Sequence, residues 1–134
     1  MTTALPQDLL ELLRRPSPCF VTTLMPDGSP QTTQTWVDTD GEHVMLNLKA
    51  DTQKVRNLAR DPRITVAVAD PDLPQRYYAV RGRVAATTTD GAAENIDELS
   101  RKYTGQTYAE FRGVTDARLL VTIHAHSIHS PTYA

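Results

Sequence analysis

The chain has 134 residues, of which 40% are hydrophobic, and a formal net charge of −2. This length suits one domain spanning residues 1–134, which can bury a core without disulfides or structural metal. The near-neutral charge excludes a generally basic nucleic-acid-binding protein. No apolar run is long enough to span a membrane, no signal pattern opens the chain, and Cys19 is the only cysteine, so we expect a cytoplasmic protein.

The first part of the chain predicts a short helix followed by three antiparallel strands. Residues 6–15, PQDLLELLRR, place leucines at the spacing of an amphipathic helix. The next runs are β-branched or alternating, and Asp-Gly turns separate them, which is a strong signal for hairpins. The predicted strands are CFVTTLM (19–25), PQTTQTWVD (30–38) and HVMLNL (43–48).

The rest of the chain predicts three further strands and short helices. Gly82 lies inside a long predicted strand, where it indicates a bend or bulge. Asp90 is the predicted N-cap of a helix. The predicted helices are 52–59, 90–105 and 108–112, and the predicted strands are ITVAVA (64–69), YYAVRGRVAATT (77–88) and ARLLVTIHAHSIH (117–129). About six antiparallel strands in so short a chain are expected to close into a barrel with peripheral helices, which removes exposed edges.

Positive charge gathers in one segment, residues 46–63, which holds five basic and only two acidic residues. Asp51 is the predicted N-cap of the helix in this segment, and Lys54 then lies in its first turn. A cation there opposes the helix dipole unless an anion binds at the helix start. Lys49 adds a second cation. The pattern therefore fits either an anion site or a solvated basic face, and spacing alone does not separate the two.

The motif KVRNLARDPR (54–63), preceded by the DGSP turn (27–30) and Trp36, resembles the split β-barrel flavin and deazaflavin oxidoreductases. This is the pyridoxamine 5′-phosphate oxidase-like superfamily, and the resemblance is closest to its small F420-dependent branch. The similarity runs over residues 9–128. It implies an FMN-binding split-barrel fold and a homodimer with a cofactor in each cleft at the subunit interface.

The resemblance also implies which residues contact the cofactor. The phosphate is expected to bind a set of polar and basic residues on the third predicted strand and the helix after it: Asn47, Lys49, Thr52 and Lys54. The ring is expected to lie against the second predicted strand, at Thr33, Gln34, Thr35 and Trp36. The partner subunit is expected to close the pocket with Arg76, Tyr77 and Tyr78. Thr52 stands where some relatives carry an arginine, which removes one charge from the phosphate site.

The implied activity is hydride transfer between F420 and a small organic substrate, with FMN as the alternative cofactor. A non-catalytic F420 or FMN carrier needs the same phosphate site and stays open. The oxidase of pyridoxamine phosphate itself is less favoured, because its members usually carry a tryptophan-containing C-terminal segment and no tryptophan follows Trp36. No catalytic residue is assigned, although Tyr78 could donate a proton.

Two other features are tempting but carry no assigned function. HAHSIH (124–129) could chelate zinc through histidines two residues apart, but no carboxylate or cysteine accompanies them, so we expect no metal site. Cys19 is expected to be a buried apolar residue rather than a nucleophile.

Overall fold

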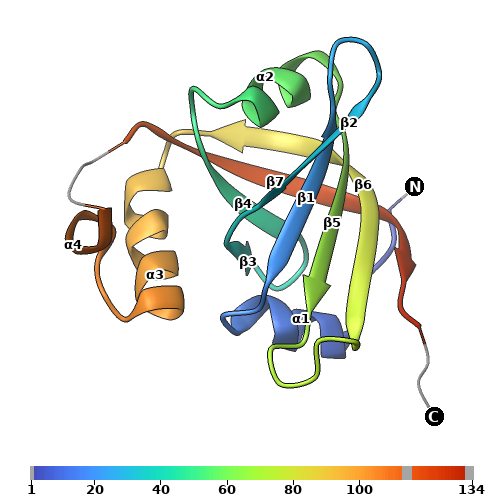
Figure 1. The fold of residues 1–134 in the computed structure, drawn as a ribbon, viewed down its shortest axis with the longest axis horizontal. Coiled ribbons are helices and arrows are strands. Elements are labelled where there is room, and N and C mark those ends of the chain that lie inside the picture. Colours follow the sequence, from blue (N-terminus) through green and yellow to red (C-terminus); the bar gives the residue numbers. More distant parts are fainter. Residues whose placement is uncertain (1, 113–115, 132–134) are drawn as a thin grey trace.

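The structure is a computed structural model that describes residues 2–112 and 116–131. Within these ranges the chain forms seven strands and four helices (Figure 1). The strands are β1 (Cys19–Leu24), β2 (Pro30–Gln34), β3 (Val37–Thr39), β4 (Val44–Lys49), β5 (Arg63–Ala69), β6 (Tyr77–Thr88) and β7 (Arg118–His129). The helices are α1 (Gln7–Arg14), α2 (Gln53–Arg60), α3 (Ala92–Thr104) and α4 (Tyr108–Arg112).

All seven strands belong to one antiparallel sheet with the order β2-β1-β5-β6-β7-β4-β3. The sheet curls around a single core, so its two edge strands, β2 and β3, approach each other where the chain joins them (Figure 1). This arrangement confirms the predicted split barrel. Helices α1 and α2 cover its two ends, and α3 and α4 lie to one side.

The structure has one strand more than the sequence predicts, because the second predicted strand divides at Thr35–Trp36. Its first half pairs with β1, and its second half pairs with β4 at the opposite edge of the sheet. The Thr35 N–H still bonds to the Cys19 carbonyl, at 3.0 Å, and the chain then leaves β1. A period-two pattern cannot reveal that a strand changes its partner halfway.

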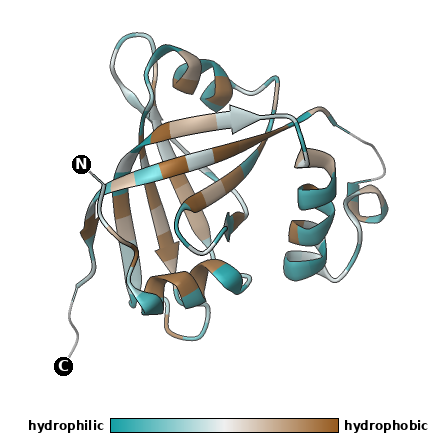
Figure 2. Ribbon diagram, turned by 180° about the vertical axis from the view of Figure 1, so that it is seen from behind, coloured by the Kyte–Doolittle hydropathy of each residue, from teal (hydrophilic) through white to brown (hydrophobic). Residues whose placement is uncertain are grey.

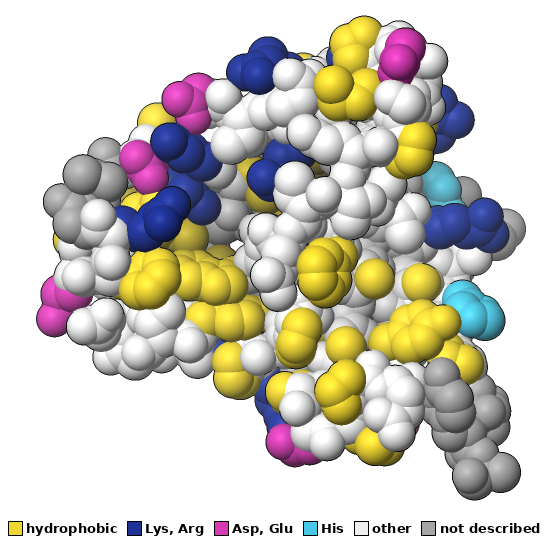
Figure 3. Space-filling model, viewed as in Figure 1, with side chains coloured by type: hydrophobic (Ala, Val, Ile, Leu, Met, Phe, Trp, Pro, Cys, Tyr) yellow, Lys and Arg dark blue, Asp and Glu magenta, His cyan; other side chains and the backbone are white. Residues whose placement is uncertain are grey.

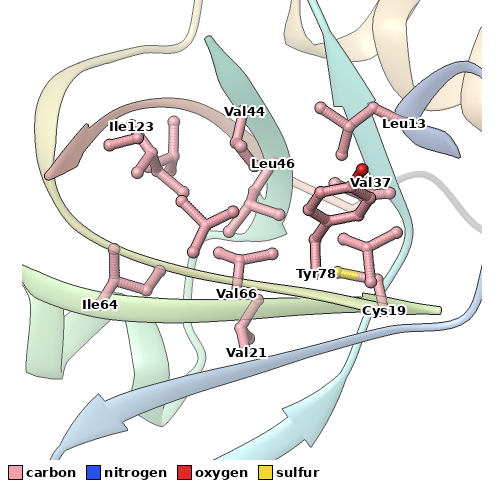
Figure 4. Close-up of a cluster of buried hydrophobic side chains, with 14 of the residues drawn as sticks. Leu13, Cys19, Val21, Val37, Val44, Leu46, Ile64, Val66, Tyr78 and Ile123 are labelled. Carbon is pink, nitrogen blue, oxygen red and sulfur yellow. The ribbon is translucent and has the colours of Figure 1, made fainter. Parts of the chain in front are cut away.

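Inward-facing aliphatic side chains fill the core, and α1 closes one end with Leu9 and Leu13, both 0% exposed. Figure 4 shows these side chains meeting from β1, β4, β5 and β7. Colouring by hydropathy shows the same alternation of apolar and polar residues along the strands (Figure 2). Cys19 belongs to this core, where burial raises the pKa of its thiol to about 12. The prediction of a buried, unreactive cysteine is confirmed.

Glycines mark the predicted turns and the bulge. Gly28 and Gly41 adopt φ values of 86° and 95° in the turns after β1 and β3, where a residue without a β-carbon is favoured. The register of β6 against β7 shifts between Arg81 and Gly82. A β-carbon at Gly82 would collide with the backbone carbonyl of His124, so the close approach of the two strands requires glycine.

Two predicted N-caps are wrong by one residue. Helix α2 begins after Thr52 rather than Asp51, and the Thr52 hydroxyl donates to the Lys49 carbonyl at 2.9 Å instead of capping the helix. Helix α3 begins after Gly91 rather than Asp90, because Gly91 takes the left-handed conformation (φ 77°) that redirects the chain. In both cases the local turn geometry outweighs the preference for an acidic cap.

Helix α2 is fastened to the barrel through a buried amide. Asn57 is 0% exposed, and its side-chain amide donates to the Thr23 hydroxyl on β1 at 3.0 Å. The C-terminal turn is closed by Asp61, whose carboxylate accepts bonds from the Arg63 backbone and guanidinium. None of the helices in the described part of the chain is long and apolar enough to cross a membrane.

Candidate cofactor site

A cavity of about 440 Å³ lies between the sheet and the α3–α4 pair. Its walls come from five places in the chain that are distant in sequence: the segment before β1, the β2–β3 junction, β4, the start of β7, and both helices. The volume falls within the range of sites for small molecules and cofactors. In Figure 3 hydrophobic side chains gather beside α3 and α4, with Lys and Arg side chains directly above them.

One wall of the cavity is aromatic. The rings of Trp36 and Tyr103 stack at 5.4 Å with 12° between their planes, and Phe111 lies 5.7 Å from Trp36 in a tilted arrangement. Offset stacked and tilted geometries are the favoured ones for aromatic pairs. Phe111 keeps 44% of its surface exposed, so the wall offers an aromatic face to a planar ligand.

Hydrogen bonds hold this wall in place. The Tyr103 hydroxyl accepts a bond from the Val37 N–H at 3.2 Å and donates to the Ser17 carbonyl at 2.7 Å, and burial raises its pKa. Lys102 donates to the carbonyls of Leu13 and Val37 at 2.8 and 2.6 Å. Burial lowers the pKa of this lysine. Helix α3 is therefore tied to α1, to the segment before β1 and to β3.

The other end of the cavity is basic and is organised around Arg118 on β7. Its Nε donates to the Asn47 side-chain oxygen at 2.9 Å, and its two terminal nitrogens donate to the Asn47 carbonyl and the Tyr108 hydroxyl. Tyr108 in turn donates to Asp116 at 2.5 Å. Burial is the main cause of the lowered pKa of Arg118.

Further cations lie close to Arg118. Burial, followed by the charge of Arg118, lowers the pKa of Lys54 on α2. The hydrogen bond from Tyr108, together with the charges of Lys49, Arg118 and Arg112, lowers the pKa of the Asp116 carboxyl. Two carboxylates lie among the four cations, Asp116 and Asp51, and Asp51 is 3.9 Å from the ammonium of Lys49. The four cations are Lys49, Lys54, Arg112 and Arg118. The region therefore keeps a positive excess that favours an anion.

The structure brings together four of the predicted cofactor residues at the cavity wall: Gln34, Thr35, Trp36 and Asn47. Thr33 faces the other way, because it pairs with the buried Val21 and its hydroxyl lies inside the half-barrel without a partner in the described residues. Lys49, Thr52 and Lys54 do not line the cavity. The two lysines lie beside its basic end, and Thr52 lies at the start of α2.

The residues predicted to come from a partner subunit lie away from this protomer's own cavity. Arg76 forms ion pairs with Asp8 and Asp70, at 3.4 and 3.9 Å. Tyr77 lies near His129, with ring centroids 6.3 Å apart. Tyr78 is 9% exposed and packs among Cys19, Val37 and Leu13 (Figure 4). Their proposed roles in a partner's site remain predictions.

Sequence reasoning missed several residues of the site. Tyr103, Tyr108, Phe111, Arg112 and Arg118 all line the cavity, yet none was singled out as a site residue. The run YAEFR, two aromatic residues and an arginine in five positions, is the one local signal that could have drawn attention to α4. Arg118 gave no signal, since its importance depends on contacts with residues far away in the sequence.

The histidines do not form a metal centre in the part of the chain that the structure describes. His124 stacks on His43, with ring centroids 5.1 Å apart, and His126 is exposed on the same strand. Residues 2–112 and 116–131 contain no group of three or more potential ligands that could hold a metal ion.

A curled antiparallel sheet with an aromatic and basic cavity beside the junction of its edges defines a split β-barrel protein. The family comparison agrees: the model of the pyridoxamine 5′-phosphate oxidase family matches residues 5–130. The chain belongs to this family of oxidoreductases, whose fold binds flavin-type cofactors.

Solved structures support the assignment. The chain is 28% identical to a protein named F420 reductase, with a TM-score of 0.77, over 93% of this chain and 98% of that one. A conserved hypothetical protein of Mycobacterium tuberculosis is 24% identical over 96% of this chain and 85% of its own, with a TM-score of 0.72. A candidate pyridoxamine 5′-phosphate oxidase from Listeria innocua is 17% identical over 92% and 94%, with a TM-score of 0.68. The last two show the fold alone.

Among curated proteins, a segment of 86 residues, 64% of this chain, is 33% identical to a DNA ligase of Stenotrophomonas maltophilia. The matched segment spans only 10% of the length of that ligase. A local match of this extent carries no conclusion about ligation.

Proposed function

We propose that the protein is a cytoplasmic F420-dependent oxidoreductase that transfers a hydride between the deazaflavin and a small organic substrate. The observation that carries the proposal is the juxtaposition of an aromatic wall and a basic end in one cavity, next to the residues of the KVRNLARDPR motif. A ring system bearing an anionic side chain has the same two parts. The similarity to a protein named F420 reductase favours the deazaflavin over FMN.

The residues present fit such a cofactor. Trp36, Gln34 and Thr35 offer the ring a flat surface and polar groups at the β2–β3 junction. Lys49 and Lys54 lie beside the start of α2, where a phosphate would be stabilised by both ammonium groups and the helix dipole. When bound, the deazaflavin supplies a hydride, so the protein is required mainly to position the reactants and exclude water.

FMN remains the second candidate cofactor, and a carrier without activity remains the second candidate function. Titration of the purified protein with F420 and with FMN, followed by tryptophan fluorescence, separates the two cofactors, because Trp36 is the only tryptophan and lies at the cavity. Oxidation of reduced F420 by a panel of quinones and enones separates an enzyme from a carrier. Failure to bind either cofactor contradicts the proposal, and tight binding without turnover favours the carrier.

We also propose that the active form is a homodimer in which each subunit closes the other's cavity. The outer face of β1 exposes 45% of Phe20, and the same row of the sheet holds Gln34, Ala67 and Ala79. Gln34 also lines the cavity, so this apolar face is continuous with the cavity wall. A second copy seated there could bring Arg76 and Tyr77, whose side chains are not buried in the core of their own protomer, to the cofactor.

A further inference from the structure

We infer that Phe111 and Arg112 of α4 form a recognition site for the acceptor, and that the preferred acceptor is a flat conjugated molecule carrying a carboxylate. The inference rests on the proposed function for the redox role of this acceptor. It assigns substrate binding to α4, and it leaves the phosphate of the cofactor with Lys49 and Lys54, which do not line the cavity.

The two arginines at the cavity differ in what they can still bind. Arg118 already directs its Nε and both terminal nitrogens to protein oxygens, on Asn47 and Tyr108. Its side chain is only 11% exposed. Arg112 is exposed and, among the described residues, makes no hydrogen bond or ion pair. The planar guanidinium of Arg112 can therefore take a carboxylate in a two-pronged interaction, whereas that of Arg118 is committed to the protein.

Phe111 supplies the second half of the recognition. It belongs to the same short helix as Arg112, and it is the outermost member of the aromatic wall, with 44% of its surface exposed against partly buried Trp36 and Tyr103. When a flat conjugated ring covers an exposed aromatic side chain, it removes apolar surface from water and adds a stacking contact, and the neighbouring cation can pair with an anionic group of the same ligand. The pair thus selects both the shape and the charge of its ligand.

The test uses two naphthoquinones of similar size: menadione, and an analogue that carries a carboxymethyl group and therefore a negative charge. Both are expected to quench Trp36 when they bind, so affinity is measured without turnover. The protein is first saturated with F420, or with FMN if only FMN binds. We expect the carboxylated quinone to bind about fivefold more tightly than menadione, which is near the upper limit for an exposed ion pair.

Three variants assign the effect. Arg112→Gln should abolish the preference and leave menadione binding unchanged, and Phe111→Ala should weaken both quinones. Arg101→Gln removes an exposed arginine of α3 that does not line the cavity, so it should change neither affinity. Equal affinities for the two quinones in the wild type would overturn the inference. Binding of the quinones to the cofactor-free protein but not to the cofactor-saturated protein would also overturn it, because α4 would then belong to the cofactor site.

The outcome is separable from that of the proposed function. If neither cofactor binds but the quinones still show the charge preference, the proposed cofactor is wrong and the α4 site stands. If cofactor binds and reduces both quinones with equal KM in the wild type and in Arg112→Gln, the proposed function stands and the α4 site does not exist.

Discussion

At the scale of single residues, Lys54 illustrates how burial and repulsion favour ligand binding. Its ammonium is partly buried, has the charge of Arg118 nearby and has no ion pair within the described ranges. A cation in this position adds little to the stability of the folded chain, but it gains a partner when an anion arrives. A binding residue is thus one whose replacement weakens ligand binding more than it lowers the stability of the folded chain.

Lys54→Ala should weaken F420 or FMN binding by roughly tenfold or more, because a hydrogen bond to a charged group contributes about 1.5–3 kcal/mol. The melting temperature of the cofactor-free protein should stay nearly the same. Fluorescence titration and thermal unfolding measure the two quantities. Arg56→Ala, an exposed cation on the same helix, is the control and should bind normally. Unchanged affinity in Lys54→Ala would place the phosphate elsewhere.

Asp61 acts in the opposite sense, by stabilising the folded state. Its hydrogen bonds from Arg63 lower its pKa to about 2. A depressed pKa in the folded state stabilises the protein above the unfolded pKa, and this contribution is lost as pH falls from about 4 towards 2. Asp61→Asn should therefore be less stable than the wild type at about pH 6, with a gap that narrows on acidification. Urea denaturation over this range measures the gap, and a constant gap would contradict the assignment.

At the scale of elements, the attachment of α2 matters because this helix carries Lys54. The amide of Asn57 bridges from the helix to Thr23 in a place without solvent. Asn57→Ala should lower the free energy of unfolding by about 1–3 kcal/mol, since Thr23 would lose a buried partner. Chemical denaturation measures the change. Arg56→Ala is again the matched control, and a loss equal to that of the control would show that α2 is held by apolar packing alone.

Most of the helices and strands could be predicted from the sequence, because their formation depends on residues that are neighbours along the chain. Asp-Gly turns and alternating residues predict the hairpins, and all four helices are predicted, three of them with an apolar face. The division of the second strand at Thr35–Trp36 could not be predicted, because it depends on β4 and β1 lying at different places in the sheet. Arg118 and Tyr108 were missed for the same reason, since the cavity that they line exists only after α3 and α4 pack against the sheet.

At the scale of the whole molecule, the proposed dimer predicts that one apolar face controls both assembly and binding. Phe20→Asp places a charge on the exposed face of β1, outside the core of the protomer. It should convert the protein to a folded monomer that binds cofactor weakly, as measured by light scattering with size exclusion and by titration. A dimeric Phe20→Asp protein would rule out this face as the interface.

The junction at Thr35–Trp36 has a consequence for how such proteins diversify. There the two edges of the sheet are joined by covalent bonds along the chain rather than by a ladder between strands. The side chains of Thr35 and Trp36 can therefore be replaced without shifting the register of any strand pair. A substitution there can alter what the cavity binds while the pairing of the seven described strands stays intact.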